Sequence, residues 1–216
     1  MKGFDSKFKN FPDYIIGITK EIWEDRSIAS LYDYYDKNII VRSPSSIIVG
    51  NKKVIDATIA TLAEFPERTL YGEDVIWSGS PNLGMLSSHR IQSTATHSNP
   101  GIYGRPTGRK LKYRIIADCH AKNNKINDEW LIRDQGAIVK QLDWDPKDFA
   151  RDLISREGGP EKCIKPYTHD NDVKGPYKGK GNDNEWGKLF SYTLNQILSA
   201  DFSVISREYD SALNLE

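Results

Sequence analysis

The sequence predicts an α+β fold, in which helices near the N-terminus pack against a curved antiparallel sheet and enclose a small apolar pocket. The main evidence is a change of period along the chain. Between residues 14 and 64 most apolar residues recur at helical spacing, whereas between residues 70 and 139 they alternate with polar residues as in strands. Helices followed by a run of strands are typical of α+β folds and differ from the alternation of parallel α/β proteins.

The elements can be assigned in order. Helical spacing predicts helices over residues 14–23, 28–35 and 51–64. Pro66 follows the third, where proline cannot continue a hydrogen-bonded turn. Strands are expected over residues 38–42, 47–49, 70–77, 84–97, 111–121 and 126–139. Asn123-Asn124 lies between the last two strands and suits a two-residue hairpin turn, because asparagine tolerates positive φ.

The chain changes character after residue 142. A short helix is predicted over residues 146–154, followed by a segment rich in Gly, Pro, Lys, Asn and Asp and by a helix over residues 186–199. We therefore expect a domain over residues 1–142, a linker with a short helix over residues 143–187, and a helical segment over residues 188–216.

The last segment shows a weak similarity to the first helices. Ile22-Trp23 matches Ile197-Leu198, and Tyr35-Asp36 matches Tyr209-Asp210 with one position deleted between them. Two interpretations stay open. Any two amphipathic helix pairs share such a pattern, or the helical segment is the start of a second, truncated copy of the domain.

Composition narrows the function classes. The 216 residues include 30 basic and 30 acidic side chains, and this balance predicts no nucleic-acid partner. Cys119 and Cys163 form no C-x-x-C pair, and no close-spaced histidine motif appears, so we expect no metal. The sequence contains no P-loop or Rossmann pattern, so we expect no cofactor. Without a signal core or a membrane-length apolar run, the protein is expected in the cytoplasm with no membrane partner.

The hairpin around Asn123-Asn124 predicts a candidate site. A two-residue turn pairs Ala117 with Trp130 and Tyr113 with Asp134, which places Asp134 as the only carboxylate on the apolar face. Burial raises the pKa of a carboxylate and suits it to general acid–base work. The alternative is a hydrogen-bonded residue at the end of the strand. On the preceding strand, His89 and His97 alternate onto one face, with His97 at its end.

Residues 14–142 resemble the SnoaL-like polyketide (ester) cyclase family of the nuclear transport factor 2-like superfamily, also described as cystatin-like. The resemblance rests on the opening helix with IWED, on NIIVRSPSS, AEFPER, EDVIWSG, STATH and YGRPTGRKL, and on KNNKINDEWLIRDQGAIVKQL. It implies a cone-shaped sheet packed against the N-terminal helices, with a C-terminal extension.

The resemblance also implies roles for individual residues. The aspartate four residues after the tryptophan, Asp134, corresponds to the acid–base residue of family cyclases, and His120 corresponds to an assisting histidine. His97 matches a pocket histidine. His120 falls on the opposite face of the predicted hairpin, and a bulge would reconcile the two positions.

We therefore expect an enzyme of the cyclase, isomerase or lyase type that transfers a proton on a carbon acid. Asp134 and His120 are its catalytic residues, and His97, His89, Trp130 and Tyr113 contact an apolar or carbonyl-containing substrate. The alternative is a non-catalytic module of the same fold that binds a small ligand or forms a dimer. A homodimer is expected from the resemblance.

Overall fold

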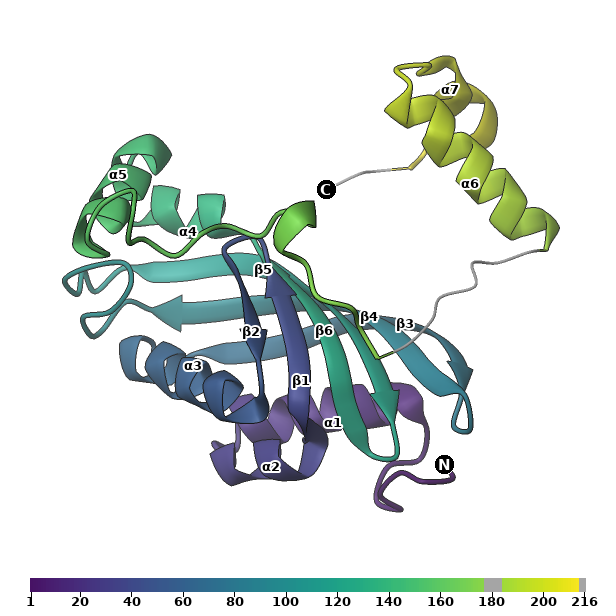
Figure 1. Cartoon of the computed structure of the whole chain (residues 1–216), viewed down its shortest axis with the longest axis horizontal. Helices are drawn as coiled ribbons and strands as arrows, with labels where there is room; N and C mark the ends of the chain where they lie inside the picture. The colour runs from purple at the N-terminus through teal and green to yellow at the C-terminus, as the bar shows by residue number, and fades with distance from the viewer. Residues whose placement is uncertain (177–183, 214–216) are drawn as a thin grey trace. The chain divides into compact units, whose positions relative to one another are not determined.

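The computed structural model describes residues 1–176 and 184–213. It divides the chain into two compact units, Met1–Tyr177 and Lys178–Glu216, whose relative placement is not determined. Each unit is described by itself (Figure 1). None of the helices in these described ranges is long and apolar enough to cross a membrane.

Two helices of the first unit precede its strands in the chain, and a third lies between the second and third strands. Helix α1 (Phe11–Trp23) begins three residues earlier than predicted, because the Asn10 side chain accepts a hydrogen bond from the Asp13 N–H and caps the helix. Helix α2 (Leu31–Tyr34) follows a single 3₁₀ turn, and α3 (Asn51–Glu64) spans the predicted residues. The buried residues of α1 are Phe11, Tyr14, Ile15, Ile18 and Ile22.

The sheet has six strands in the order β2-β1-β6-β5-β4-β3. Their bounds are β1 (Tyr35–Ser43), β2 (Ser46–Val49), β3 (Thr69–Ser80), β4 (Gly84–Thr96), β5 (Lys110–Lys122) and β6 (Lys125–Arg133). All neighbours are antiparallel except β1 and β6, which are parallel. Helices α1, α2 and α3 lie on one side of the sheet (Figure 1), which we call its inner face. The predicted α+β fold is confirmed.

A β-bulge in β6 changes the predicted pairing of the hairpin. The turn itself is as predicted, with positive φ at Asn123 and Asn124. Beyond it, however, Ala121 pairs with Ile126 and His120 with Asp128, so one extra residue of β6 lies between them. The bulge reverses the alternation of β6. Trp130 consequently pairs with Asp118 on the outer face, not with Ala117, and the predicted face assignment was wrong.

The strand predicted over residues 126–139 ends at Arg133. Asp134 caps the next helix, α4 (Gln135–Gln141), by accepting a hydrogen bond from the Ala137 N–H at 2.8 Å. Helix α5 (Pro146–Arg156) follows, with Asp145 as its cap. This change of structure places the Asp134 carboxylate at a helix start and not within a strand.

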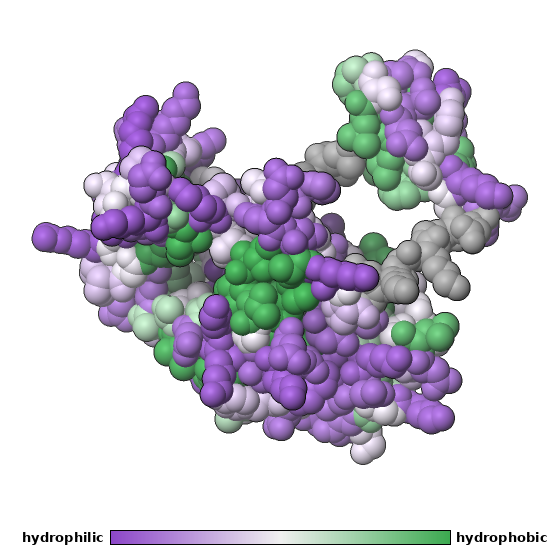
Figure 2. All heavy atoms as spheres, in the orientation of Figure 1, coloured by the Kyte–Doolittle hydropathy of each residue, from purple (hydrophilic) through white to green (hydrophobic). Residues whose placement is uncertain are grey.

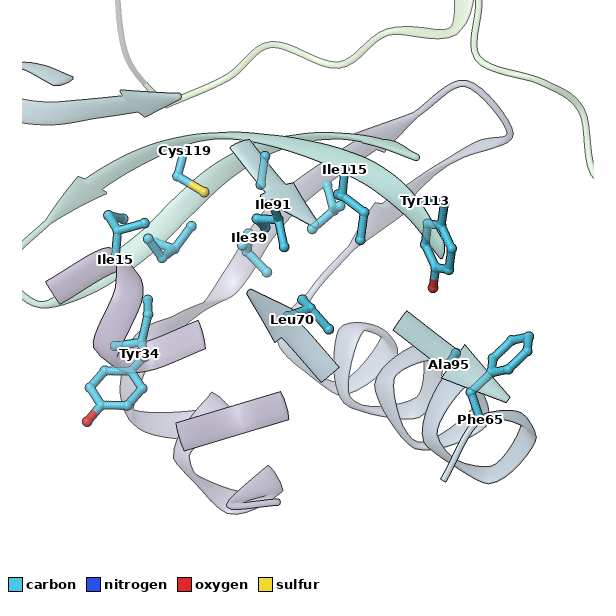
Figure 3. Close-up of a cluster of buried hydrophobic side chains, with 14 of the residues drawn as sticks. Ile15, Tyr34, Ile39, Phe65, Leu70, Ile91, Ala95, Tyr113, Ile115 and Cys119 are labelled. Atoms are coloured by element: carbon cyan, nitrogen blue, oxygen red, sulfur yellow. The ribbon is translucent and has the colours of Figure 1, made fainter. Parts of the chain in front are cut away.

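The core of the first unit lies between the inner face and the helices. Figure 3 shows Ile91, Tyr113, Ile115 and Cys119 of the sheet on the side where Ile15 of α1 lies. Side chains from the predicted linker join the same core, namely Phe149, which is buried, and Trp144 and Leu153, which are half-buried.

The described part of the predicted linker, residues 143–176, therefore packs on the cone domain. Its last stretch, residues 167–175, crosses the outer face of β1 and β6, and we call it the strap. The Tyr167 N–H donates to the Pro44 carbonyl, and Arg42 donates to both Asp172 and the Val173 carbonyl. The first compact unit thus continues well beyond residue 142, whereas the division into a domain, a linker and a helical segment stays a prediction.

The second unit contains α6 (Glu185–Leu198) and α7 (Ser203–Glu208). Like α1, α6 is capped by an asparagine, Asn184, and its four-residue connection holds one left-handed residue, Ala200, as the α1 connection holds Arg26. With Ile22 matched to Ile197, the buried positions of α1 fall on Trp186, Leu189, Phe190, Thr193 and Ile197. The interpretation as a second copy stays a prediction, and these parallels favour it.

Hydrophobic surface is unevenly distributed. On the first unit, Figure 2 shows a mainly hydrophilic surface with one compact hydrophobic area over β1 and β2, where β2 contributes the apolar residues Ile47, Ile48 and Val49. On the second unit, hydrophobic residues gather on part of the surface (Figure 2), and exposed Trp186, Phe190 and Leu198 belong to α6.

Candidate active site

A cavity of about 600 Å³ lies between the inner face of the sheet and helices α1 and α3. Most of its wall is apolar, with Ile15 and Ile18 from α1 and Ile91, Ile115 and Leu131 from the sheet. The exposed lining residues gather at one end, which marks the entrance. They are Pro44 and Ser45 of the β1–β2 turn, Ala57 of α3, and Asp134, Gln135 and Gly136 at the start of α4.

Glu129 is the buried carboxylate of this cavity. It lies on the inner face of β6, opposite Cys119 of β5 and beside Val41 of β1, and only 6% of it is exposed. Burial raises the pKa of Glu129 to about 7, although a hydrogen bond with the Tyr35 hydroxyl and the charge of Arg133 act in the opposite direction. A carboxyl group with this pKa can both accept and return a proton near neutral pH.

Tyr35 and Cys119 remain protonated beside Glu129. Burial, the largest cause, and the Glu129 charge raise the pKa values of both side chains well above their ordinary values. The Tyr35 hydroxyl can therefore serve as a neutral hydrogen-bond donor to the Glu129 carboxylate. The thiol of Cys119 is not activated as a nucleophile, because a nucleophilic cysteine needs a lowered pKa.

His89 lies on the inner face of β4, between β3 and β5. It is 2% exposed, and burial lowers its pKa to about 4, so the imidazole is neutral. Its Nε2 has no hydrogen-bond partner. Gly72 makes room for the ring, because a Cβ at that position would lie 2.8 Å from Nε2. The cavity wall thus includes a neutral imidazole whose buried Nε2 lies against Gly72 and has no hydrogen-bond partner.

Two guanidinium groups line the cavity nearer the entrance. Arg68 is 1% exposed and its contacts are all with neutral groups: it donates from Nε to Ser93 at 3.2 Å and lies 4.4 Å from the ring of Trp23. Arg133 is half-buried, two residues beyond Leu131 on β6. Nη1 of Arg68 and Nε of Arg133 are buried without partners. Burial lowers the pKa of Arg68 to about 10, and the Arg133 charge contributes, so Arg68 remains cationic at neutral pH.

The sequence was compared with known protein families. The family described as SnoaL-like polyketide cyclase matches residues 14–142, well over half of the chain. The chain belongs to this family. No curated protein matches it significantly.

Solved structures agree on the fold. IdmH from Streptomyces antibioticus is 18% identical, with a TM-score of 0.53, over 61% of this chain and 97% of the other. A protein of Jannaschia sp. CCS1 assigned to the SnoaL-like polyketide cyclases is 12% identical, with a TM-score of 0.54, over 62% of this chain and 92% of the other. TsrD from Streptomyces laurentii is 11% identical, with a TM-score of 0.52, over 61% and 92%. At these identities the similarity shows the fold alone.

Within this SnoaL-like domain, Asp134 does not have the predicted environment. Its side chain is exposed at the entrance, where it caps α4, and it is not on the apolar face of the sheet. The physical reasons are the β6 bulge, which gives the inner position to Glu129, and the start of α4, which Asp134 caps directly after the strand ends at Arg133. The catalytic role that the family resemblance gives Asp134 stays a prediction.

The other predicted residues are divided between the two faces. His89 lines the cavity, and Tyr113 is buried on the inner face next to Arg68 without lining it. His120 and Trp130 lie on the outer face. There His120 contacts Asn127, with 2.5 Å between Nδ1 and Oδ1, and Trp130 packs against Arg42 and Tyr167 of the strap. These two positions cannot reach the cavity from the far side of the sheet.

His97 belongs to a separate buried cluster. It packs against Phe65 and Tyr103, and its Nε2 lies 3.4 Å from the Glu64 carboxylate, which accepts hydrogen bonds from the N–H groups of Ile102 and Tyr103. It does not line the cavity. This cluster fixes the loop after β4, so the predicted role of His97 in substrate binding has no support from its position.

Glu129, Tyr35, Arg68 and Arg133 were missed by the sequence analysis. Regular alternation assigns Glu129 and Arg133 to the charged outer face of the hairpin, and only a bulge reverses them. In residues 1–176 and 184–213, no three His, Cys, Asp or Glu side chains gather as a metal site would require.

Proposed function

We propose that this SnoaL-like domain is an acid–base enzyme that transfers a proton on a carbon acid, and that Glu129 is its base. The observation that carries the proposal is a carboxyl group buried in an apolar cavity, with a pKa of about 7. Such a group is ionised often enough to accept a proton at neutral pH, and it is basic enough to take one from carbon.

The reaction begins when the Glu129 carboxylate removes a proton from the carbon next to a substrate carbonyl. The C–H bonding pair moves towards the carbonyl oxygen and forms an enolate. Neutral His89 donates a hydrogen bond to that oxygen when its proton is on Nε2, which has no other partner. The apolar wall excludes water and strengthens this interaction.

The fate of the enolate defines the reaction type. If its carbon attacks a second carbonyl of the same substrate, a C–C bond forms and the proton on Glu129 passes to the new alkoxide, which closes a ring. If the proton returns to another carbon, the product is an isomer. If a group leaves from the neighbouring carbon, the reaction is an elimination. Each type fits the proposed cyclase, isomerase or lyase activity.

Proton exchange tests this proposal without knowledge of the natural substrate. With 2-tetralone as the probe, the rate of deuterium uptake from D₂O is measured by NMR for the wild type and for Glu129→Gln, Asp134→Asn and the exposed control Glu67→Gln. Glu129→Gln is expected to lower the catalysed rate at least ~100-fold. Asp134→Asn and Glu67→Gln should change it less than about 2-fold, within the range expected for residues outside the reaction. Loss of exchange in Asp134→Asn alone would assign the base to Asp134, as the family resemblance implies.

A non-catalytic module that binds a small ligand is the second candidate function. The size and apolar wall of the cavity favour it as much as they favour catalysis, whereas the raised pKa of Glu129 favours catalysis. Saturable binding of 2-tetralone without any catalysed exchange, in the wild type as in Glu129→Gln, would support this function and contradict the enzymatic proposal.

A homodimer through the outer face of the sheet is part of the proposal. The strap covers β1 and β6 on this face, while exposed Tyr71, Ile76 and Ile132 lie among Arg90 and Arg114 on the rest of it. An interface here would therefore be polar in part. Light scattering of the wild type and of Ile76→Glu tests it: a dimer that Ile76→Glu weakens supports this surface, and a monomeric wild type contradicts it.

A further inference from the structure

The two guanidinium groups of the cavity, Arg68 and Arg133, form no ion pair with any carboxylate of the residues that the structure describes. The charge of Arg133 acts on Glu129, but these two side chains are not in ion-pair contact. Elsewhere in the same unit a buried arginine is fully paired: Arg42 donates to Asp128 and Asp172 at 2.6 Å each. Buried charges are normally paired because removing them from water is costly. Arg68 and Arg133 are therefore exceptions that need an explanation.

The two groups are close enough to act on one ligand. Arg68 donates to Ser93 of β4, which pairs with Tyr113 of β5. The next inward-facing pair of these strands is Ile91 with Ile115. Ile115 also pairs with Arg133 of β6. Arg68 and Arg133 thus approach the cavity from adjacent rows of the sheet. Each has a buried nitrogen without a hydrogen-bond partner, Nη1 in Arg68 and Nε in Arg133, and both residues line the cavity.

Resting on the proposed function, we infer that the substrate of this cavity carries a carboxylate, which Arg68 and Arg133 bind while Glu129 takes a proton from a carbon deeper in the cavity. The planar fork of a guanidinium matches the two oxygens of a carboxylate. Glu129 lies four residues before Arg133 on β6, so about 13 Å of strand separates their Cα atoms. The substrate would accordingly be an elongated molecule with an apolar body and a carboxylate towards the entrance.

A carboxylate fits this site better than a phosphate. The lining contains two arginines but no lysine, and about half of its other residues are Ile, Leu, Val or Ala. With Glu129 ionised, the two guanidinium groups and this carboxylate together carry one net positive charge, which matches a single substrate carboxylate. A phosphate monoester carries close to two negative charges and would be repelled more strongly by Glu129, so the preference for carboxylate follows from the charge balance.

Binding of matched probes tests the inference. Isothermal titration calorimetry compares 2-naphthylacetate with its methyl ester, its amide and 2-naphthyl phosphate, which share the naphthalene body. A charge-assisted hydrogen bond contributes enough that the acid is expected to bind ~10- to 100-fold more tightly than the ester or the amide. In Arg133→Gln, and in Arg68→Met combined with Arg133→Gln, the ratio is expected to fall stepwise towards one, while the ester keeps its affinity.

Equal affinity for acid and ester in the wild type, or an unchanged ratio in both variants, would overturn the inference, and so would a preference for the phosphate. The same titration in Glu129→Gln separates this result from the proposed function. That variant cannot take the proton, yet it should keep the preference for the acid. If the acid is preferred but neither the wild type nor the variant exchanges protons, carboxylate binding stands and only the catalytic proposal fails. The exposed Lys52→Gln serves as a matched control for the loss of one positive charge and should keep the wild-type ratio.

Discussion

The raised pKa of Glu129 predicts that this residue destabilises the folded protein at neutral and alkaline pH. In the unfolded chain Glu129 ionises around its ordinary value of 4.5, whereas in the folded protein it ionises around pH 7. Between these two values the unfolded state gives up a proton that the folded state retains. The free energy of unfolding of the wild type should therefore fall as pH rises from 4.5 to 7 and should lose nothing more from this residue above pH 7.

The magnitude follows from the size of the shift. About 2.5 pKa units at 1.36 kcal/mol each correspond to about 3 kcal/mol of stability. Glu129→Gln removes the ionisation. The unfolding free energy of this variant minus that of the wild type should therefore be larger at pH 8 than at pH 5, by up to about 3 kcal/mol. The attraction between the Glu129 carboxylate and Arg133 is already contained in the pKa of about 7, so it does not reduce this difference further.

Urea unfolding followed by tryptophan fluorescence measures this difference between pH 5 and pH 9. The exposed Glu67→Gln is the matched control and should stay within about 0.5 kcal/mol of the wild type at every pH. A difference between Glu129→Gln and the wild type that does not change with pH would refute the reasoning, since it would mean that burial does not shift the ionisation of Glu129. The proposed base would then lose its main support.

Substitutions at four other residues have distinct expected results. As pH falls from 6.5 to 5, the wild type should lose ~2 kcal/mol of stability relative to His89→Gln in urea unfolding. The reason is that His89 takes up a proton in the unfolded chain but stays neutral in the folded protein. Arg42→Met should lower the unfolding free energy by about 3–5 kcal/mol because it leaves Asp128 buried and unpaired. By contrast, Asp172→Asn, at a side chain about one-third exposed, should cost less than ~1 kcal/mol and mainly speed proteolysis within residues 157–176. Asp134→Ala should cost about 1 kcal/mol of thermal stability through the lost cap, whereas Asp134→Asn keeps the cap and should cost almost nothing.

Much of the fold could be predicted because the local signals agree with the tertiary structure. The helix over residues 51–64 has the predicted bounds, since Pro66 and a regular apolar stripe both limit it. The turn at Asn123-Asn124 was also identified correctly, because few residues tolerate its positive φ. These features depend on a few neighbouring residues, which a single sequence displays directly.

The site could not be predicted because it depends on long-range pairing. Arg68 is buried because it meets Ser93 of β4, a residue 25 positions later in the chain. No local pattern near residue 68 indicates this contact. The strap is similar: its composition is typical of a linker, and residues distant in sequence hold it on the sheet, among them Arg42, 130 residues earlier than Asp172. The regular hairpin pairing and the family resemblance both indicated Asp134, and the resemblance alone indicated His120; the structure places these two residues at the entrance and on the outer face.

The extra residue of β6, Asn127, explains why regular alternation assigns Glu129 to the wrong face. Deleting Asn127 would remove the bulge but keep every later pair, because Asp128 would follow Ile126 directly, opposite His120, and Glu129 would stay opposite Cys119 on the inner face. We expect the deletion to cost about 1 kcal/mol in urea unfolding, from the lost contact between Asn127 and His120, and to retain proton exchange. Asn127→Gly keeps the bulge and should behave in the same way. If the deletion variant stays folded but no longer exchanges protons, the pairing of Glu129 with Cys119 is not what places the base in the cavity, and the proposed role of Glu129 fails.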